Sequence, residues 1–110
     1  MSVVEIAKQY FKIFSKKDLN GLKEMFSKDI KLIDWEIKVQ GLEQVIETIG
    51  NIFESVESIK INPYAIYNDD KAVIAELEII INSKQEILQV VDIIEFDNEF
   101  KISAIRAYKR

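Results

Sequence analysis

The sequence contains no cysteine and no histidine, and only one proline and three glycines among its 110 residues. Without cysteine the chain can form no disulfide and offers no thiol nucleophile. Without cysteine and histidine it also lacks the usual ligands of structural zinc. Catalysis by Ser–His or Cys–His pairs is excluded for the same reason. Any acid–base chemistry must therefore fall to Asp, Glu, Tyr or Lys side chains.

The chain also lacks a strong charge of one sign and a long apolar run. Its formal net charge is −4, and the basic residues are scattered with acidic ones between them, which disfavours nucleic-acid binding. The apolar runs have the length of short strands and cannot span a membrane. Residues 1–11 do not have the layout of a signal peptide. We therefore expect a cytoplasmic protein that binds neither nucleic acid nor membrane.

The composition that remains is that of a soluble folded protein, with 48% hydrophobic and 31% charged residues. A chain of this length fits one domain spanning residues 1–110. We expect its core to bury roughly two thirds of the surface of the unfolded chain.

The N-terminal residues predict two helices. Ser2 and Glu5 have the spacing of a capping box, and apolar residues at helical spacing follow them until Lys16 and Lys17. Asp18 is the expected N-cap of the second helix. The apolar face of that second helix is expected to consist of Leu19, Leu22, Met25 and Phe26.

Residues 30–39 are expected to form one or two short strands. Their alternation is ambiguous, because one face carries Ile30, Leu32 and Asp34 and the other carries Ile33, Trp35, Ile37 and Val39. Gly41 then precedes a third helix, because the apolar residues after it recur at helical intervals. Those residues are Leu42, Val45, Ile46, Ile49, Ile52 and Phe53.

From Val56 onward the apolar period changes to two, which predicts strands. We expect Pro63 at a sheet edge or at a bulge, because proline donates no backbone hydrogen bond. Helices collected before strands indicate the α+β class: three helices packed against a curved, mostly antiparallel sheet with a concave interior. The four expected strands lie near residues 57–67, 71–82, 86–96 and 100–109.

Ile79, Ile80 and Ile81 make their strand apolar on both faces. A sheet that is covered on both sides would satisfy this pattern, and a second copy of the chain could supply the second cover. We therefore expect a homodimer through the outer face of the sheet.

Asp92 stands within the otherwise apolar strand QVVDIIEF, residues 89–96. Alternation along this strand puts Asp92 on the same face as Val90, Ile94 and other core residues. A buried carboxylate without a partner is costly, so it is usually paired, protonated or used in chemistry. Asp92 is therefore a candidate functional residue.

The order of elements resembles the nuclear-transport-factor-2-like (NTF2-like) superfamily, whose cone-shaped fold includes the SnoaL-like polyketide cyclases and the ketosteroid isomerases. Residues 8–34 are similar to the opening of the isomerases. They carry Tyr10 on the first helix, DLNG at 18–21, FSKD at 26–29 and a strand that ends in Asp34. The spacing from Tyr10 to Asp34 matches that between the tyrosine and the base of the isomerases.

Residues 90–96, VVDIIEF, resemble the isomerase strand that carries a second, acidic oxyanion donor, here Asp92. The resemblance implies that Asp34 moves a proton while Tyr10 and a protonated Asp92 donate hydrogen bonds to the oxygen that becomes charged. It implies neither metal nor cofactor, and a small apolar ligand inside the cone. The expected ligand-binding residues are Phe14, Trp35, Val90, Ile94 and Arg106.

Less specific roles stay open for the same residues. Asp92 could form a cross-strand pair with Arg106, which would keep it ionised. Asp34 could be an exposed acid at a strand end, and Tyr10 a core tyrosine. Tyr64 and Tyr67 fit a core or an interface.

Two functions therefore remain. The first is a SnoaL-like, ketosteroid-isomerase-like enzyme that moves a proton on a small apolar carbonyl compound. The second is a non-catalytic module for small-molecule binding or dimerisation on the same fold, because a fold does not fix an activity. The enzyme requires Tyr10, Asp34 and Asp92 around one cavity.

Overall fold

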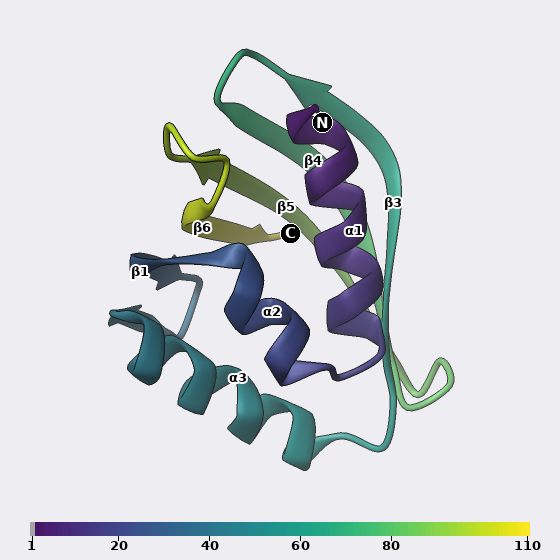
Figure 1. Cartoon of the computed structure of the whole chain (residues 1–110). Helices are drawn as coiled ribbons and strands as arrows, with labels where there is room; N and C mark the ends of the chain where they lie inside the picture. The colour runs from purple at the N-terminus through teal and green to yellow at the C-terminus, as the bar shows by residue number, and fades with distance from the viewer. Residues whose placement is uncertain (1) are drawn as a thin grey trace.

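The computed structural model describes residues 2–110 of the chain (Figure 1). The helices are α1 (Val3–Ser15), α2 (Leu19–Met25) and α3 (Leu42–Ser55). The strands are β1 (Phe26–Ile33), β2 (Lys38–Gln40), β3 (Ile59–Asn68), β4 (Ala72–Ile81), β5 (Glu86–Phe96) and β6 (Ile102–Lys109). None of the helices in residues 2–110 combines the length and the apolar character that a membrane crossing requires.

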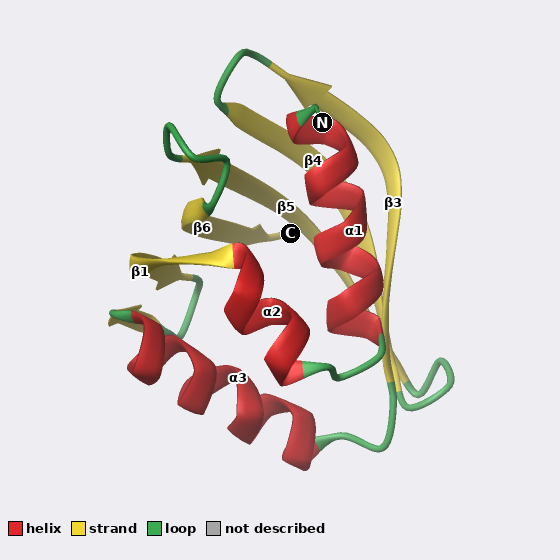
Figure 2. Cartoon of the chain, in the orientation of Figure 1, coloured by secondary structure: helices red, strands yellow, loops and turns green. Residues whose placement is uncertain are grey.

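The six strands form one curved sheet in the order β2-β1-β6-β5-β4-β3. Only the β1–β6 pairing is parallel, and the other four are antiparallel. Figure 2 shows the three helices, in red, on the inner side of the curved sheet. This arrangement confirms the expected α+β fold with helices against a mostly antiparallel sheet.

The helices begin where their caps predict. The Ser2 hydroxyl accepts from the backbone N–H of Glu5, whose carboxylate in turn accepts from Ser2, so the capping box is present. Asp18 accepts from the N–H of Gly21 at the start of α2. Gly41 precedes α3 with a φ of +101°, a conformation that glycine adopts without strain.

Phe26 departs from the prediction, since it begins β1 instead of completing the apolar face of the second helix. Its side chain is buried, and its backbone lies opposite Ile102 of β6. An apolar residue at this position suits either element, so the pairing with a strand 76 positions later decides between them. Helix propensity alone carries no such information.

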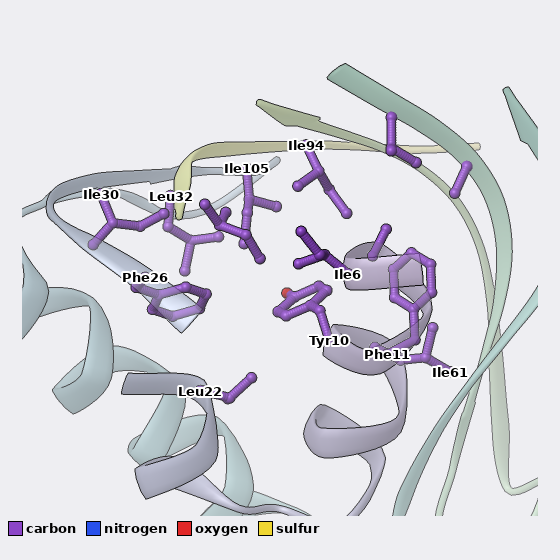
Figure 3. Packing of buried hydrophobic residues seen from close by; sticks show 14 of the residues in the cluster. Ile6, Tyr10, Phe11, Leu22, Phe26, Ile30, Leu32, Ile61, Ile94 and Ile105 are labelled. Atoms are coloured by element: carbon purple, nitrogen blue, oxygen red, sulfur yellow. The ribbon is translucent and has the colours of Figure 1, made fainter. Parts of the chain in front are cut away.

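The core lies between the helices and the concave face of the sheet (Figure 3). Tyr10 occupies its centre, and its ring lies 5.5 Å from the ring of Phe11 and 6.1 Å from that of Phe26. Tyr10 and Phe11 leave α1 in different directions, with Phe11 directed toward Ile61 of β3. The helix α1 therefore has the Tyr10 side chain on one side and the Phe11 side chain on another.

Two irregularities shape the sheet. At Pro63 the pairing of β3 with β4 shifts register, and β3 is an edge strand, so both expectations for Pro63 are confirmed. On β6, Ile102 lies opposite Phe96 while Ala104 lies opposite Glu95, which leaves Ser103 as an extra residue. Beyond such a bulge, the residues that strict alternation would place on one face of the strand lie on the other face.

Ser15 connects the end of α1 to the free edge of β3. Its hydroxyl donates to the backbone oxygen of Phe11 at 2.8 Å and accepts from the N–H of Ile61 at 2.9 Å. The hydroxyl thereby satisfies an outward-facing donor of the edge strand.

Replacing Ser15 by alanine should lower the free energy of unfolding by about 1–2 kcal/mol, because the N–H of Ile61 loses its partner. The measurement is urea unfolding followed by circular dichroism. Ser55→Ala is the matched control, since the exposed Ser55 hydroxyl contacts only its own helix and its loss should cost less than about 0.5 kcal/mol. Equal losses in the two variants would contradict this role of Ser15.

Candidate functional site

A cavity of about 150 Å³ lies between the helices and the concave face of the sheet. Its lining is apolar apart from the side chains of Tyr10, Asp34 and Asp92 and the indole of Trp35. The three residues that the enzyme hypothesis requires therefore meet at one cavity, although they come from α1, the end of β1 and β5.

The register of the sheet explains how the two carboxyl groups reach the same cavity. Ile33 lies opposite Arg106, so Asp34 follows at the level of Ala107. Asp92 lies opposite Ala107 on one side and Ala75 on the other. Both neighbours of Asp92 on this face are thus alanines, whose small side chains leave room around the acid.

Asp92 is 6% exposed, and its carboxyl has no hydrogen-bond or ion-pair partner among residues 2–110. Burial raises its pKa from 3.8 to about 7, and the nearby charge of Asp34 acts in the same direction. Near neutral pH a large fraction of Asp92 is therefore a neutral acid, which can donate a hydrogen bond.

Tyr10 is 3% exposed and lines the cavity beside Phe14. Burial raises the pKa of its phenol well above the ordinary value, and the charge of Asp92 raises it further. The ring is fixed between neighbouring aromatic rings, and no hydrogen bond joins its hydroxyl to another group in residues 2–110. Tyr10 is thus a core residue that also presents a neutral donor to the cavity.

Asp34 is held by the turn between β1 and β2. Its Oδ1 accepts from the N–H groups of Glu36 and Ile37, each at 2.7 Å, and its own N–H donates to the oxygen of Ile37 at 2.8 Å. These bonds fix the carboxylate at the cavity wall and leave Oδ2 without a partner in the described part of the chain. Asp34 is half-buried, so it is not simply an exposed acid.

Trp35 forms the rim of the cavity and is 40% exposed. The Nζ of Lys109 lies 5.1 Å from the centre of its ring, a cation–π geometry that holds the indole in place. Phe14 and Val90, two other expected ligand-binding residues, also line the cavity.

Ile94 and Arg106 lie away from the cavity, so the expectation that they bind its ligand does not fit their positions. Ile94 is fully buried in the core. Arg106 lies on the outer face opposite Ile93 and forms an ion pair with Glu95 at 3.1 Å. The alternative of an Asp92–Arg106 pair is therefore wrong, because the bulge at Ser103 turns Arg106 outward.

The sequence did not indicate the residues that create the space. Ala107 lies beside Asp92 only because of the bulge in β6, which alternation along the sequence cannot reveal. Tyr64 and Tyr67 belong to neither the cavity nor the core, since both side chains are exposed. The core interpretation of these two tyrosines is wrong, and the interface interpretation stays a prediction.

Comparison with known proteins gives one match in sequence and many in structure. Residues 7–105 match the family model of the SnoaL-like domain. No curated protein matches the sequence.

Three solved structures illustrate the similarity in fold. A candidate SnoaL-like polyketide cyclase from Shewanella denitrificans has a TM-score of 0.87 at 15% identity, over 98% of this chain and 90% of that one. A candidate ketosteroid isomerase from Kribbella flavida has a TM-score of 0.84 at 11% identity, over 98% of this chain and 77% of that one. An LEH-like epoxide hydrolase from M. tuberculosis has a TM-score of 0.83 at 14% identity, over 98% and 82%. At these identities the likeness establishes the fold, which hosts several chemistries.

Replacing Asp92 by asparagine should flatten the dependence of stability on pH. The folded wild type keeps its proton up to about pH 7, whereas the unfolded chain loses it near pH 4, so wild-type stability falls between these values. The full difference is at most about 4 kcal/mol. Urea unfolding at pH 4.5 and pH 8 measures it.

Asp29→Asn, at an exposed position of β1, is the control for the loss of one carboxylate. Its pH dependence should stay close to that of the wild type. If Asp92→Asn and Asp29→Asn followed the same curve, Asp92 would not carry a raised pKa.

Proposed function

The chain belongs to the SnoaL-like domain family, and we propose that it is an isomerase that moves one proton within a small apolar carbonyl compound. The observation that carries this proposal is the meeting of Tyr10, Asp34 and Asp92 at one otherwise apolar cavity. Two donors, Tyr10 and neutral Asp92, line the same space as the Asp34 carboxylate, and this space contains little else that is polar. Such an arrangement suits a reaction in which charge develops on one oxygen.

In the proposed reaction the unoccupied Oδ2 of Asp34 removes a proton from the carbon between a carbonyl group and a carbon–carbon double bond. The electron pair moves into the conjugated system, and negative charge gathers on the carbonyl oxygen. Tyr10 and neutral Asp92 stabilise this oxygen by donating hydrogen bonds. Asp34 then returns the proton to the far end of the system, so substrate and product are isomers.

Protonation of Asp92 sets the upper pH limit of this mechanism. With a pKa of about 7, Asp92 loses its donor proton as the pH rises above neutrality, and its charge then repels the developing oxyanion. The rate should therefore fall in the alkaline direction.

The size of the cavity restricts the substrate. Its volume of about 150 Å³ lies below the roughly 300–1,000 Å³ typical of pockets for drug-sized ligands. An apolar protein cavity of about this volume accommodates a molecule such as benzene. We therefore propose a substrate with one small ring or a short chain, and not a steroid.

A non-catalytic binding module is the second candidate, and one observation favours it. The Asx-type turn gives Asp34 a structural role that is independent of chemistry, because its Oδ1 organises the turn between β1 and β2. In that case the cavity would bind a small apolar ligand, with Tyr10 and Asp92 donating to its oxygen, and no turnover would follow.

We also propose that the chain forms a homodimer through the outer face of the sheet. That face carries the exposed apolar side chains of Tyr67 and Ile74, which are cross-strand neighbours, and of Ile87 further along the sheet, although the solvent face of an antiparallel sheet is usually polar. Wild-type protein should sediment as a dimer at about 50 µM, and Ile74→Lys should sediment as a monomer with an unchanged circular dichroism spectrum. A monomeric wild type at that concentration would refute the dimer.

The activity is tested with cyclohex-3-enone, whose conversion to its conjugated isomer increases ultraviolet absorbance. We expect turnover above buffer, at least about 100-fold less with Asp34→Asn, and about 100-fold less with Tyr10→Phe. 5-Androstenedione should react much more slowly, since it exceeds the cavity. Asp29→Asn is the control that removes a carboxylate outside the cavity.

Binding of phenol, whose hydroxyl resembles an enol, separates the two functions. Phenol binding that Tyr10→Phe weakens, without turnover of any β,γ-unsaturated ketone, would establish the binding module and exclude the enzyme. Absence of both binding and turnover would exclude the cavity as a site for such compounds.

A further inference from the structure

A second hollow lies on the opposite side of α1 from the cavity. This hollow, the lysine groove, has a volume of about 400 Å³ and runs between α1 and the edge strand β3. Its walls are formed by Lys8 and Lys12 of α1, by Lys16 at the C-cap of this helix and by Lys60 of β3, and its floor by Phe11, Ile61 and Pro63. None of these lysines belongs to the cavity described above.

The charge of the groove is opposite to that of the chain. The protein has a formal net charge of −4, yet four lysines line this one hollow. None of the four forms an ion pair within residues 2–110. The acid nearest to them on α1, Glu5, is occupied by the capping box with Ser2.

Lys8, Lys12 and the C-cap residue Lys16 recur every four residues, so they form one row about 12 Å long along the helix. Like charges at this spacing destabilise a helix, and Glu5, three residues before Lys8, is the single acid on α1 that offsets them. A bound anion would remove the repulsion. The row therefore favours a negatively charged ligand along the groove.

The apolar floor of the groove indicates that the ligand also has an apolar part. Phe11 and Ile61 lie side by side at its base, and both are almost fully buried (Figure 3). The one hydroxyl in the lining, that of Ser15, already bonds to Phe11 and Ile61. The aliphatic stems of the lysines extend this apolar surface, while their ammonium groups stay at the rim.

The form of the site excludes extended partners. A flat bilayer cannot reach the base of a concave hollow. A peptide strand cannot add to this edge, because the N–H of Ile61 is occupied and Pro63 has none. A volume of about 400 Å³ lies in the range of small-molecule sites.

We propose that the lysine groove binds a free carboxylate amphiphile, a small acid with a medium-length hydrocarbon chain. The chain lies on Phe11, Ile61 and Pro63, and the carboxylate lies between ammonium groups of neighbouring lysines. This site is independent of the isomerase proposal, because it shares only the Ile61 side chain with the cavity.

The test is a titration with octanoate, monitored by backbone amide NMR at 150 mM salt. We expect saturable shifts at residues 8–16 and 60–62, and no such binding of octanol or octylammonium. The double variant K12Q/K16Q should bind octanoate about tenfold more weakly, and its affinity should no longer depend strongly on salt. K23Q/K28Q removes two exposed lysines outside the groove and should bind like the wild type.

Four outcomes would overturn the proposal. They are no saturable octanoate binding at 10 mM, equal binding of octanol, shifts confined to Tyr10, Asp34 and Asp92 in the cavity, or vesicles of anionic lipid binding while octanoate does not. Circular dichroism of each variant checks folding. A titration of the single variant K60Q, on a different element, tests the groove without altering α1.

Discussion

The parallel pairing of β1 with β6 is the constraint on which the cavity depends. It joins segments more than 70 residues apart, and its register sets Asp34 at the level of Ala107. Because neighbouring strands lie about 5 Å apart, Asp34 and Asp92 are separated by one strand and a small side chain. A slip of one residue would turn Asp34 to the outer face and leave Asp92 alone in the interior.

At the cavity the packing of the core is also incomplete. Asp92 is a buried acid with no partner in residues 2–110, and alanines flank it on both neighbouring strands. An interior selected only for stability would fill this space with larger apolar side chains and omit the acid. Sites that break the local rules of packing and polarity in this way are commonly those that serve a function.

Much of the fold could be predicted because its signals are local. The capping box at Ser2, Asp18 before α2 and the change of period after Val56 each fix an element with its near neighbours alone. Alternation predicts which residues face the interior wherever strand pairing is regular. Asp92 could be assigned to the interior for this reason.

What could not be predicted depends on contacts between distant residues. Phe26 suits a helix as well as a strand, and its pairing with Ile102 determines that it belongs to a strand. The extra residue Ser103 reverses the faces of β6, so alternation along the sequence assigned Arg106 to the wrong side and concealed Ala107. The volume of the cavity depends on many side chains from different elements, so no single segment of the sequence indicates it.

The ends of the sheet have a further consequence for the chain in concentrated solution. Isoleucine-rich strands such as β4 are prone to stacking into fibrils when an open edge offers a template. One edge, β2, is only three residues long, and the other, β3, has the register shift at Pro63 and the Ser15 bond to Ile61. Neither border offers a continuous ladder of free amides, so growth strand by strand is blocked while the native state persists.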